Sequence, residues 1–357
     1  MYKRQVLDAF DHSGDLVVDG LTFTNGLVAG PGGGMRIDPA ADSQVTLSNV
    51  RIIGNVSTVA GANSGGGLHV ELFGVQQLEL SNCSILDNAV GSTGGGVEAG
   101  GGLCIRATGD STFLIQGCEI ERNVVDSAGQ IFGAGIKVET SDNAQGQLLD
   151  AWMVENSAVS ADVWAAGAAF ETRGESILTV ERSAIALNTV IGDTAAQLWS
   201  SNSGLSVFRM RDSIIGLGED NGLEISAGNH GVVNLVNLTI ADNLGVGIDL
   251  GQSDLATITL YNSISYGNAS DLRILGAVEA DYNLIGLDPN FVDPAVFDYH
   301  LAFGSVAENA GLNTPPGGLG LIDFDGNSRI LDGVVDLGCF EGIGVIFASD
   351  FELGDTS

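Results

Sequence analysis

The sequence predicts an all-β fold, a single-stranded parallel β-helix (solenoid) of about ten coils. The first observation is a repeat in which two phrases alternate nine times. One is a glycine run leading into alternating apolar residues, as in GGGLHV at 65–70, and the other ends in asparagine, as in LELSNCSILDN at 78–88. The second observation is that each interval holds two or three short period-2 segments bounded by Gly, Asn, Ser and Asp. Three strands in about 25 residues are typical of one coil that hydrogen-bonds to the next.

The composition excludes several classes of protein. The chain has 357 residues with 52 glycines, 44% apolar and 16% charged residues, which excludes collagen, a charged disordered tail and a coiled coil. Its formal charge of -32 repels phosphate backbones and anionic lipids, so no nucleic-acid partner is expected. No apolar run approaches the roughly 18 residues of a membrane span, so no membrane insertion is expected.

Residues 1–287 carry the repeat and are predicted to form the β-helix. Residues 288–345 leave the repeat and are predicted to fold back as a C-terminal cap of the same domain, followed by a tail over 346–357. Asparagine tolerates left-handed backbone conformations and bonds local backbone, so the asparagines that end the second phrase are predicted to turn the chain and to stack as an amide ladder. These residues are Asn55, Asn88, Asn123, Asn156, Asn188, Asn243 and Asn268.

Alternation along the first strand of each coil assigns its side chains to two faces. Apolar residues such as Leu68 and Val70 are predicted to point into the core, so the residues between them form two outward columns. The first column reads Arg36, His69, Cys104, Lys137, Glu171, Trp199, Glu224, Asp249 and Arg273, and the second reads Asp38, Glu71, Arg106, Glu139, Arg173, Ser201 and Ser226. We define the charged strip, a candidate ligand-binding surface, as Arg36, His69, Glu71, Arg106, Lys137, Glu139, Glu171, Arg173 and Trp199.

Long segments are predicted to form a wall along one side of the charged strip. The first five coil intervals exceed the last three by about eight residues, and long segments on one face of a solenoid commonly mark the binding face. The excess falls in 56–64, 89–99, 124–132, 157–166 and 189–194. A groove would result. The alternative is that opposite charges in the columns only form cross-strand ion pairs that keep an exposed sheet soluble.

An extended sugar polymer suits such a strip, because its repeat matches the spacing of about 5 Å between strands and Trp199 could stack on a sugar ring. If the chain is an enzyme, hydrolysis would use Glu139 and Glu171, placed one coil and two residues apart and near the roughly 6.5–9.5 Å separation of inverting carboxylates. A lyase would use His69 or Lys137 as base, with Arg106 or Arg173 neutralising a uronate carboxylate. Neither set of residues forms a recognised motif.

The cysteines are placed by register. Cys83 and Cys118 hold the same inward position in consecutive coils, at a spacing of about 5 Å that a disulfide accepts, so a disulfide and a free pair both stay open. Cys104 is predicted to be an unpaired surface thiol. Neither a CxxC pair nor zinc-ligand spacing occurs, so no metal site and no cofactor are predicted.

Two further features receive structural interpretations. The segment DFDGN at 323–327 is predicted to form a turn, with calcium binding as the alternative because its side chains offer oxygen ligands. His12, His230 and His300 stand alone in the sequence and receive no role.

The pattern GGG-h-x-h plus L-x-x-N/C-x-I-x-x-N resembles the polymorphic outer-membrane-protein type of right-handed parallel β-helix. Residues 298–311, 323–329 and 335–341 resemble the closing motif of bacterial choice-of-anchor Q surface proteins, with departures at Val306, Glu308 and Cys339. The resemblance implies a right-handed helix and an extracellular or cell-surface location. It also implies a signal peptide and an N-terminal cap before Val6, which this chain does not show, so we expect a truncated reading frame and end-to-end self-association.

Three functions follow from these observations. The first is a secreted or cell-surface bacterial rod, non-enzymatic and adhesin-like, that binds extracellular polysaccharide or cell-surface glycan through the charged strip. The alternative is a polysaccharide lyase or glycoside hydrolase that acts in the same groove. The second alternative is a structural, self-assembling protein.

Overall fold

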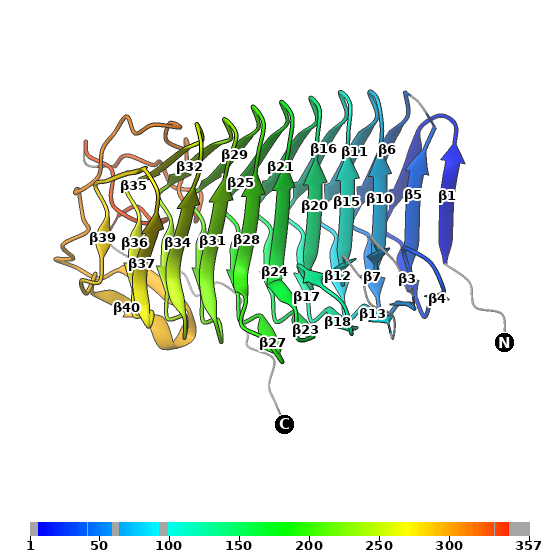
Figure 1. The fold of residues 1–357 in the computed structure, drawn as a ribbon, viewed down its shortest axis with the longest axis horizontal. Coiled ribbons are helices and arrows are strands. Elements are labelled where there is room, and N and C mark those ends of the chain that lie inside the picture. The colour runs from blue at the N-terminus through cyan, green and yellow to red at the C-terminus, as the bar shows by residue number, and fades with distance from the viewer. Residues whose placement is uncertain (1–5, 41, 59–63, 93–98, 332, 343–357) are drawn as a thin grey trace.

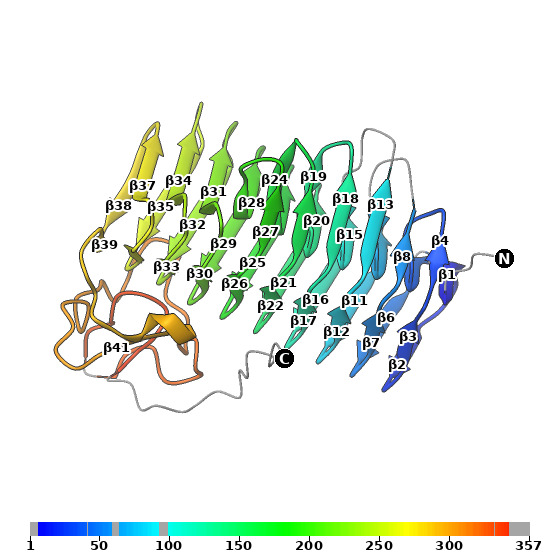
Figure 2. The same cartoon turned by 90° about the horizontal axis from the view of Figure 1, so that it is seen from below.

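Alternating apolar residues build one continuous core along the axis of a parallel β-helix. The computed structural model describes residues 6–40, 42–58, 64–92, 99–331 and 333–342. Each strand of the helix pairs in parallel with its equivalents in neighbouring coils, so the predicted fold class is confirmed (Figures 1 and 2). Leu68, for example, lies opposite Met35 on one side and Leu103 on the other.

Three long sheets, which we call A, B and C, form the faces of the helix. Sheet A consists of β1 (Leu7–His12), β5 (Met35–Pro39), β10 (Leu68–Leu72), β15 (Leu103–Ala107), β20 (Ile136–Thr140), β24 (Val163–Thr172), β28 (Ala196–Asn202), β31 (Asn221–Ala227), β34 (Val246–Gln252) and β37 (Ser270–Leu275), with β19 (Ile131–Phe132) paired to β24. Sheet B consists of β2 (Leu16–Asp19), β6 (Gln44–Ser48), β11 (Gln77–Ser81), β16 (Thr112–Gln116), β21 (Gln145–Leu149), β25 (Ile177–Glu181), β29 (Val207–Arg211), β32 (Val232–Val236), β35 (Thr257–Tyr261) and β38 (Val278–Asp281).

Sheet C and the shorter elements complete each coil. Sheet C consists of β3 (Thr22–Thr24), β7 (Arg51–Ile53), β12 (Ser84–Leu86), β17 (Glu119–Glu121), β22 (Trp152–Val154), β26 (Ala184–Ala186), β30 (Ile214–Gly216), β33 (Thr239–Ala241), β36 (Ile264–Tyr266) and β39 (Leu284–Ile285). A sheet D between C and A consists of β4 (Leu27–Val28), β8 (Val56–Ser57), β13 (Ala89–Ser92), β18 (Val124–Ser127), β23 (Ser157–Val159) and β27 (Thr189–Ile191). Two short strands, β9 (Ser64–Gly65) and β14 (Ala99–Gly100), pair with each other. Each of the five long segments predicted from the sequence therefore adds one strand to sheet D.

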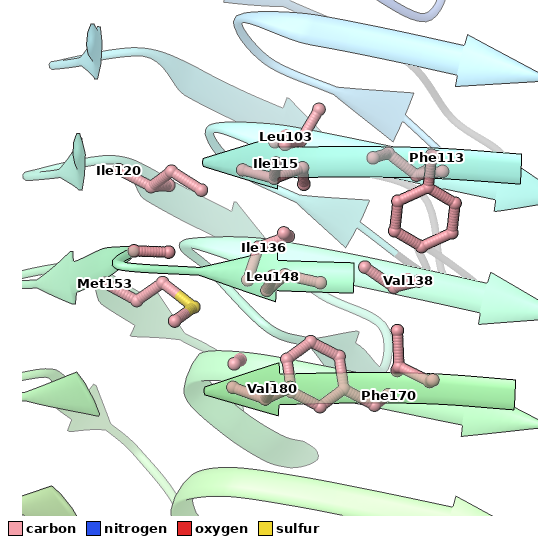
Figure 3. Packing of buried hydrophobic residues seen from close by; sticks show 14 of the residues in the cluster. Leu103, Phe113, Ile115, Ile120, Ile136, Val138, Leu148, Met153, Phe170 and Val180 are labelled. Atoms are coloured by element: carbon pink, nitrogen blue, oxygen red, sulfur yellow. The ribbon is translucent and has the colours of Figure 1, made fainter. Parts of the chain in front are cut away.

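Core side chains stack in layers because equivalent residues are in register. Leu103 lies opposite Ile136 in sheet A, and Ile115 lies opposite Leu148 in sheet B, all fully buried (Figure 3). Burial of each such side chain stabilises the fold by about 1.5–3 kcal/mol. A large side chain in one layer is balanced by a small one in the next. Phe113 lies opposite Gly146, where a Cβ atom would be 2.1 Å from the phenyl ring.

The predicted asparagine ladder is present as a buried chain of amide hydrogen bonds. Asn88 Nδ2 donates to Asn123 Oδ1 at 3.1 Å, and Asn123 Nδ2 donates to Asn156 Oδ1 at 3.0 Å. The same oxygens accept backbone N–H groups, as Asn123 Oδ1 does from Asn88 N. The close approach requires glycine in the adjacent strand, since a Cβ at Gly102 would lie 2.7 Å from Asn123 Nδ2.

The sharp turn at the ladder falls one residue earlier than predicted. The left-handed backbone conformation belongs to the residue before each ladder asparagine, for example Asp87 with φ 56° and Arg122 with φ 51°. The asparagines themselves keep negative φ and are selected for their side-chain bonds. The prediction that they adopt the left-handed conformation was therefore wrong for these residues.

The C-terminal segment packs on the flank of the last coils. It contains β40 (Phe291–Asp293), the 3-10 helix η1 (Pro294–Val296) and β41 (Asp298–Leu301), where β40 and β41 form an antiparallel pair. Tyr299 and Cys339 are buried against Ile214 and Ala241 of sheet C. Figure 2 shows the segment beside sheet C, below β37 and β38. It therefore covers a side of the helix, while β37 and β38 stay largely exposed.

Within the described part of the chain, no helix has the length and apolar character needed to cross a bilayer.

Candidate functional site

The outward face of sheet A carries the two columns, with one change of register. Lys137 lies opposite Ala169, and Glu139 lies opposite Glu171, so Glu171 belongs to the second column and not to the first. Arg173 follows β24 in the next turn. The assignment of Glu171 and Arg173 was wrong because the segment AAGAAF at 165–170 lacks the glycine run that marks the start of the phrase.

Most of the first column is buried. His69 is 1% exposed, Lys137 is fully buried, and Cys104 between them is equally inaccessible. The prediction of a surface thiol at Cys104 was wrong. Cys104 lies in register between His69 on one neighbouring strand and Lys137 on the other, and both of these residues have longer side chains than cysteine. The Lys137 ammonium also lies over the ring of Phe132, 5.0 Å from the centroid.

An aromatic cluster lies beside the first column. Phe132 stacks on Trp164 with centroids 5.7 Å apart and rings 5° from parallel, and Trp199 packs against both. Trp199 is only 6% exposed, so the prediction that it offers a free face to a sugar ring was wrong. The exposed ring is Trp164, at 38%. The sequence reasoning missed it, although Trp164 lies in the long segment 157–166 that was expected to wall the strip.

Each cation of the charged strip lies beside a carboxylate. The pairs are Arg36 Nη2–Asp38 Oδ2 at 3.3 Å, His69 Nε2–Glu71 Oε1 at 3.2 Å, Arg106 Nε–Glu139 Oε2 at 3.6 Å, Lys137 Nζ–Glu139 Oε1 at 2.7 Å, Lys137 Nζ–Glu171 Oε1 at 3.7 Å, and Arg173 with Glu171. Because these charges compensate one another, the strip offers little positive potential for a uronate polymer.

The proposed catalytic carboxylates do not flank a gap. Glu139 and Glu171 are opposite each other on neighbouring strands, and the buried Lys137 ammonium contacts both. They were expected one coil and two residues apart, at the wider separation of an inverting pair, and the register excludes that placement. A cation held between two carboxylates also neutralises the charge that a nucleophile or base would need.

His69 is a poor base for a lyase. Burial opposes its protonation, but the neighbouring Cys104 sulfur, acting as acceptor, and the hydrogen bond with Glu71 outweigh burial and raise the pKa of His69 to about 9. At neutral pH the ring is therefore already protonated and cannot accept a proton from a sugar carbon. The fully buried Lys137, with its two carboxylate contacts, is likewise remote from solvent.

A groove opens where the columns change from large to small residues. Glu171 of the second column is followed in register by Ser201, Ser226 and Gly251. The groove has a volume of about 490 Å³, and its lining combines hydroxyl and amide side chains with glycine backbone and the apolar Ala227 and Leu275. Residues that line it include Ser201, Asn202, Ser203, Ser226, Gln252 and Ser253. The groove is lined by residues at the carboxyl-terminal ends of β28, β31, β34 and β37 and in the turns that follow. These are the last four strands of sheet A (Figure 1).

Carboxylates border this groove. Glu224 and Asp249 lie two residues before Ser226 and Gly251, and are opposite each other on β31 and β34. Arg273 forms an ion pair with Asp249. Burial and then the neighbouring Asp249 raise the pKa of Glu224. The charged strip and the groove therefore differ. In the N-terminal half of the outward face of sheet A, ion pairs fill the surface, whereas the C-terminal half contains the groove with its serine residues.

The cysteine pair lies as the register predicted. Cys83 and Cys118 are buried in the core as free thiols, and the Cys83 backbone N–H points at Cys118 Sγ at 3.4 Å. A disulfide between them is therefore not formed in this structure. The hydrogen bond between the thiols, together with burial, raises the pKa of Cys118 far above its usual range.

The segment 323–327 uses its carboxylates internally. Asp323 is fully buried, and its Oδ1 accepts the backbone N–H groups of Asp325 and Asn327 while Oδ2 accepts that of Glu341. His300 was expected to stand alone, but it lies between two carboxylates. Its Nδ1 is 2.6 Å from Asp298 Oδ1, and its Nε2 is 2.6 Å from Asp325 Oδ2. Among the described residues no group of three or more His, Cys, Asp and Glu could hold a metal ion.

Comparison with known proteins adds little to these observations. A scan against protein-family models finds no match, and a search of curated proteins finds none. The chain is similar to the solved structure titled "Crystal structure of pectate lyase Pel9A", at 13% identity over 92% of this chain and 96% of that chain, with a TM-score of 0.47. A likeness at that level carries no argument about what this chain binds or does.

Proposed function

We propose that this chain is a secreted or cell-surface bacterial β-helix that binds an extended, neutral polysaccharide without turning it over. The observation that carries the proposal is the open groove along β28, β31, β34 and β37, lined by hydroxyl and amide groups. Such groups exchange hydrogen bonds with sugar hydroxyls, and strands spaced by about 4.8 Å present them in a repeating array. The resemblance of the repeat and closing motif to polymorphic outer-membrane-protein and choice-of-anchor Q proteins supports an adhesin-like role outside the cell.

Charge compensation supports a neutral ligand over a uronate. A pectin-like chain brings one carboxylate per sugar, and the described cations of the charged strip already lie beside Asp or Glu. The net charge of -32 adds long-range repulsion. The exposed Trp164 ring, whose centroid lies 5.1 Å from that of Trp199, offers an apolar face for a sugar at the amino-terminal end of β24, across sheet A from the groove at the carboxyl-terminal ends of the later strands.

A glycan array followed by calorimetry tests this function. We expect neutral polymers to bind and acidic ones to bind more weakly, without released oligosaccharides. Ser226→Trp fills the groove and is expected to weaken binding at least tenfold, while Thr257→Trp on the exposed face of sheet B is the matched control. Preference for acidic polymers, or binding unaffected by Ser226→Trp, contradicts the proposal.

Glycoside hydrolysis in the same groove is the second candidate, favoured by the Glu224–Asp249 pair. A carboxyl group with a raised pKa can act as general acid, and Asp249, which is ion-paired with Arg273, lies opposite Glu224 on the next strand. Reducing-end assays on the bound polymers decide between the two functions. Product formation that Glu224→Gln abolishes and Glu175→Gln leaves intact would establish hydrolysis and overturn binding without turnover.

A further inference from the structure

The two ends of the helix present sheet edges that match each other. Within the described residues β37, β38 and β39 pair on one side only, with β34, β35 and β36, and at the other end β1, β2 and β3 pair only with β5, β6 and β7. The last core residues are half-buried at both ends. Leu272 and Val278 at one end, and Leu7 and Leu16 at the other, pack against the core while remaining partly exposed. Unpaired edges of this kind are templates for further strands.

We infer that the chain stacks end to end with second copies of itself, with β37–β39 of one copy on β1–β3 of the next. The strand order A, B, C is the same at both ends, so a simple continuation of the helix joins each edge to its equivalent. The register extends across the joint: Leu272 and Leu7 occupy equivalent positions in sheet A, as do Val278 and Leu16 in sheet B and Ile285 and Phe23 in sheet C. Each pair would close one layer of the core.

Charges in the first outward column complement each other across the same joint. Arg273 lies opposite Asp249 at one end, and Asp8 lies opposite Arg36 at the other. Stacking places Arg273 of one copy beside Asp8 of the next, which gives the alternating series Asp249, Arg273, Asp8, Arg36. Opposite charges directly across a strand pair are favourable, whereas a head-to-head arrangement would bring together two β1 edges that both carry Asp8. The column thus favours one direction of stacking.

Two electrostatic terms oppose assembly and set its conditions. Asp281 and Asp19 hold equivalent positions in sheet B and would meet at the joint. The net charge of -32 per copy repels other copies at long range. Salt screens both terms, since the Debye length falls from roughly 30 Å at about 0.01 M to roughly 3 Å at about 1 M. Assembly should therefore increase with salt. An interface that repeats from one end to the other does not close, so the product would be an open filament.

Cysteine cross-linking between two single variants tests the joint directly. We expect a mixture of Asp8→Cys and Arg273→Cys proteins at high salt to form a covalent dimer whose bridge maps to residues 8 and 273, because residues on paired strands lie within disulfide reach. Asp8→Cys mixed with Leu205→Cys is the matched control, since Leu205 is exposed on the turn between β28 and β29, three coils before β37 at the end of sheet A. Bridges between two Asp8→Cys copies in preference to the 8–273 pair would overturn the head-to-tail arrangement.

Light scattering and negative-stain microscopy test assembly without cross-linking. We expect filaments of the unmodified chain that lengthen with salt, and at least a tenfold weaker association for Leu272→Lys, which places a charge at the edge of the core. Leu205→Lys, three coils away from the joint, should assemble as the unmodified chain does. A monomer at every salt concentration, or equal assembly by Leu272→Lys, would overturn the inference, while glycan binding by the monomer would leave the proposed function standing.

Discussion

Gln197 replaces an asparagine that the ladder lacks: its Oε1 accepts the backbone N–H of Asn188 at 3.0 Å and the Asn188 side-chain amide at 2.9 Å. In the next coil the ladder position is occupied by Gly218, whose N–H donates to Asn243 Oδ1 as a ladder asparagine would. A Cβ at Gly218 would lie 2.6 Å from Gln197 Nε2. The glutamine side chain therefore fills the space that the missing asparagine leaves.

Substitution of these two residues should show strong coupling. Gln197→Ala leaves the buried Asn188 donors without an acceptor and should destabilise the fold by about 2–4 kcal/mol. Gly218→Asn alone should also destabilise it, because the new side chain meets Gln197. The double variant Gln197→Ala/Gly218→Asn restores a ladder amide and should recover at least half of the loss. Urea unfolding of all four proteins measures the coupling, and simple additivity of the two losses would contradict it.

Buried charges that hold the C-terminal segment should make stability depend on pH. Arg329 and Asp212 are almost fully buried, with Arg329 Nε 3.4 Å from Asp212 Oδ1. Burial raises the pKa of Asp212 to about 7, against the opposing effect of Arg329. The folded state then binds more protons than the unfolded state between about pH 4 and about pH 7, so this group should make stability fall as pH rises through that window.

Two variants separate this effect from the rest of the molecule. Asp212→Asn should flatten the decline of unfolding free energy between about pH 4 and about pH 7, as measured by urea unfolding in a series of buffers. Arg329→Ala should cost about 3–5 kcal/mol at neutral pH, since it leaves a buried carboxylate without its partner, and less in acid. Arg51→Ala, at an exposed position of β7 in sheet C, is the control. An unchanged pH profile in Asp212→Asn would refute the assignment.

His69 should add a second loss of stability in the alkaline range. Its folded pKa of about 9 exceeds the ordinary 6.5, so its contribution is complete below about 6.5 and is lost as pH rises through about 9. The loss should reach roughly 3 kcal/mol. Glu71→Gln removes one partner and should lower the pKa of His69, which NMR titration of the ring protons can follow. His230→Gln should leave the alkaline decline intact.

Much of the fold could be predicted because the repeat determines which residues lie opposite each other on neighbouring strands. Fixed spacing between Leu68, Leu103 and Ile136 was enough to place them in one layer, and the ladder asparagines followed from the same spacing. The register failed at β24, where several alanines fit the apolar positions equally well. Gly167 could have indicated the correct register of β24. It lies beside Asn188 as Gly135 lies beside Asn156, and a Cβ at Gly167 would be 2.6 Å from Asn188 Nδ2.

The candidate site was harder to predict because it depends on contacts outside the repeat. Alternation shows that His69 and Lys137 point away from the core, but not that neighbouring side chains bury them. Likewise Trp164 and Phe132 lie in long segments without periodicity, so their packing on Trp199 could not be read from spacing. The groove forms because Ser226 and Gly251 have small side chains or none. This can be recognised only by comparison with the larger residues at the same register positions in earlier coils.

Trp164 should contribute to ligand binding far more than to folding. Its ring is partly exposed and stacks in parallel on Phe132, whereas Trp199 is buried below both rings and its indole N–H finds no acceptor in the described part of the chain. Trp164→Ala should weaken binding of the neutral polymer about tenfold, as loss of a stacking contact worth about 1–1.5 kcal/mol implies, and should change the unfolding free energy by less. Trp199→Ala should instead destabilise the fold by about 3–5 kcal/mol because it leaves a cavity. Trp164→Phe keeps an aromatic face and should restore most of the affinity in calorimetry, while a Trp164→Ala protein that binds normally would remove the sugar platform from the site.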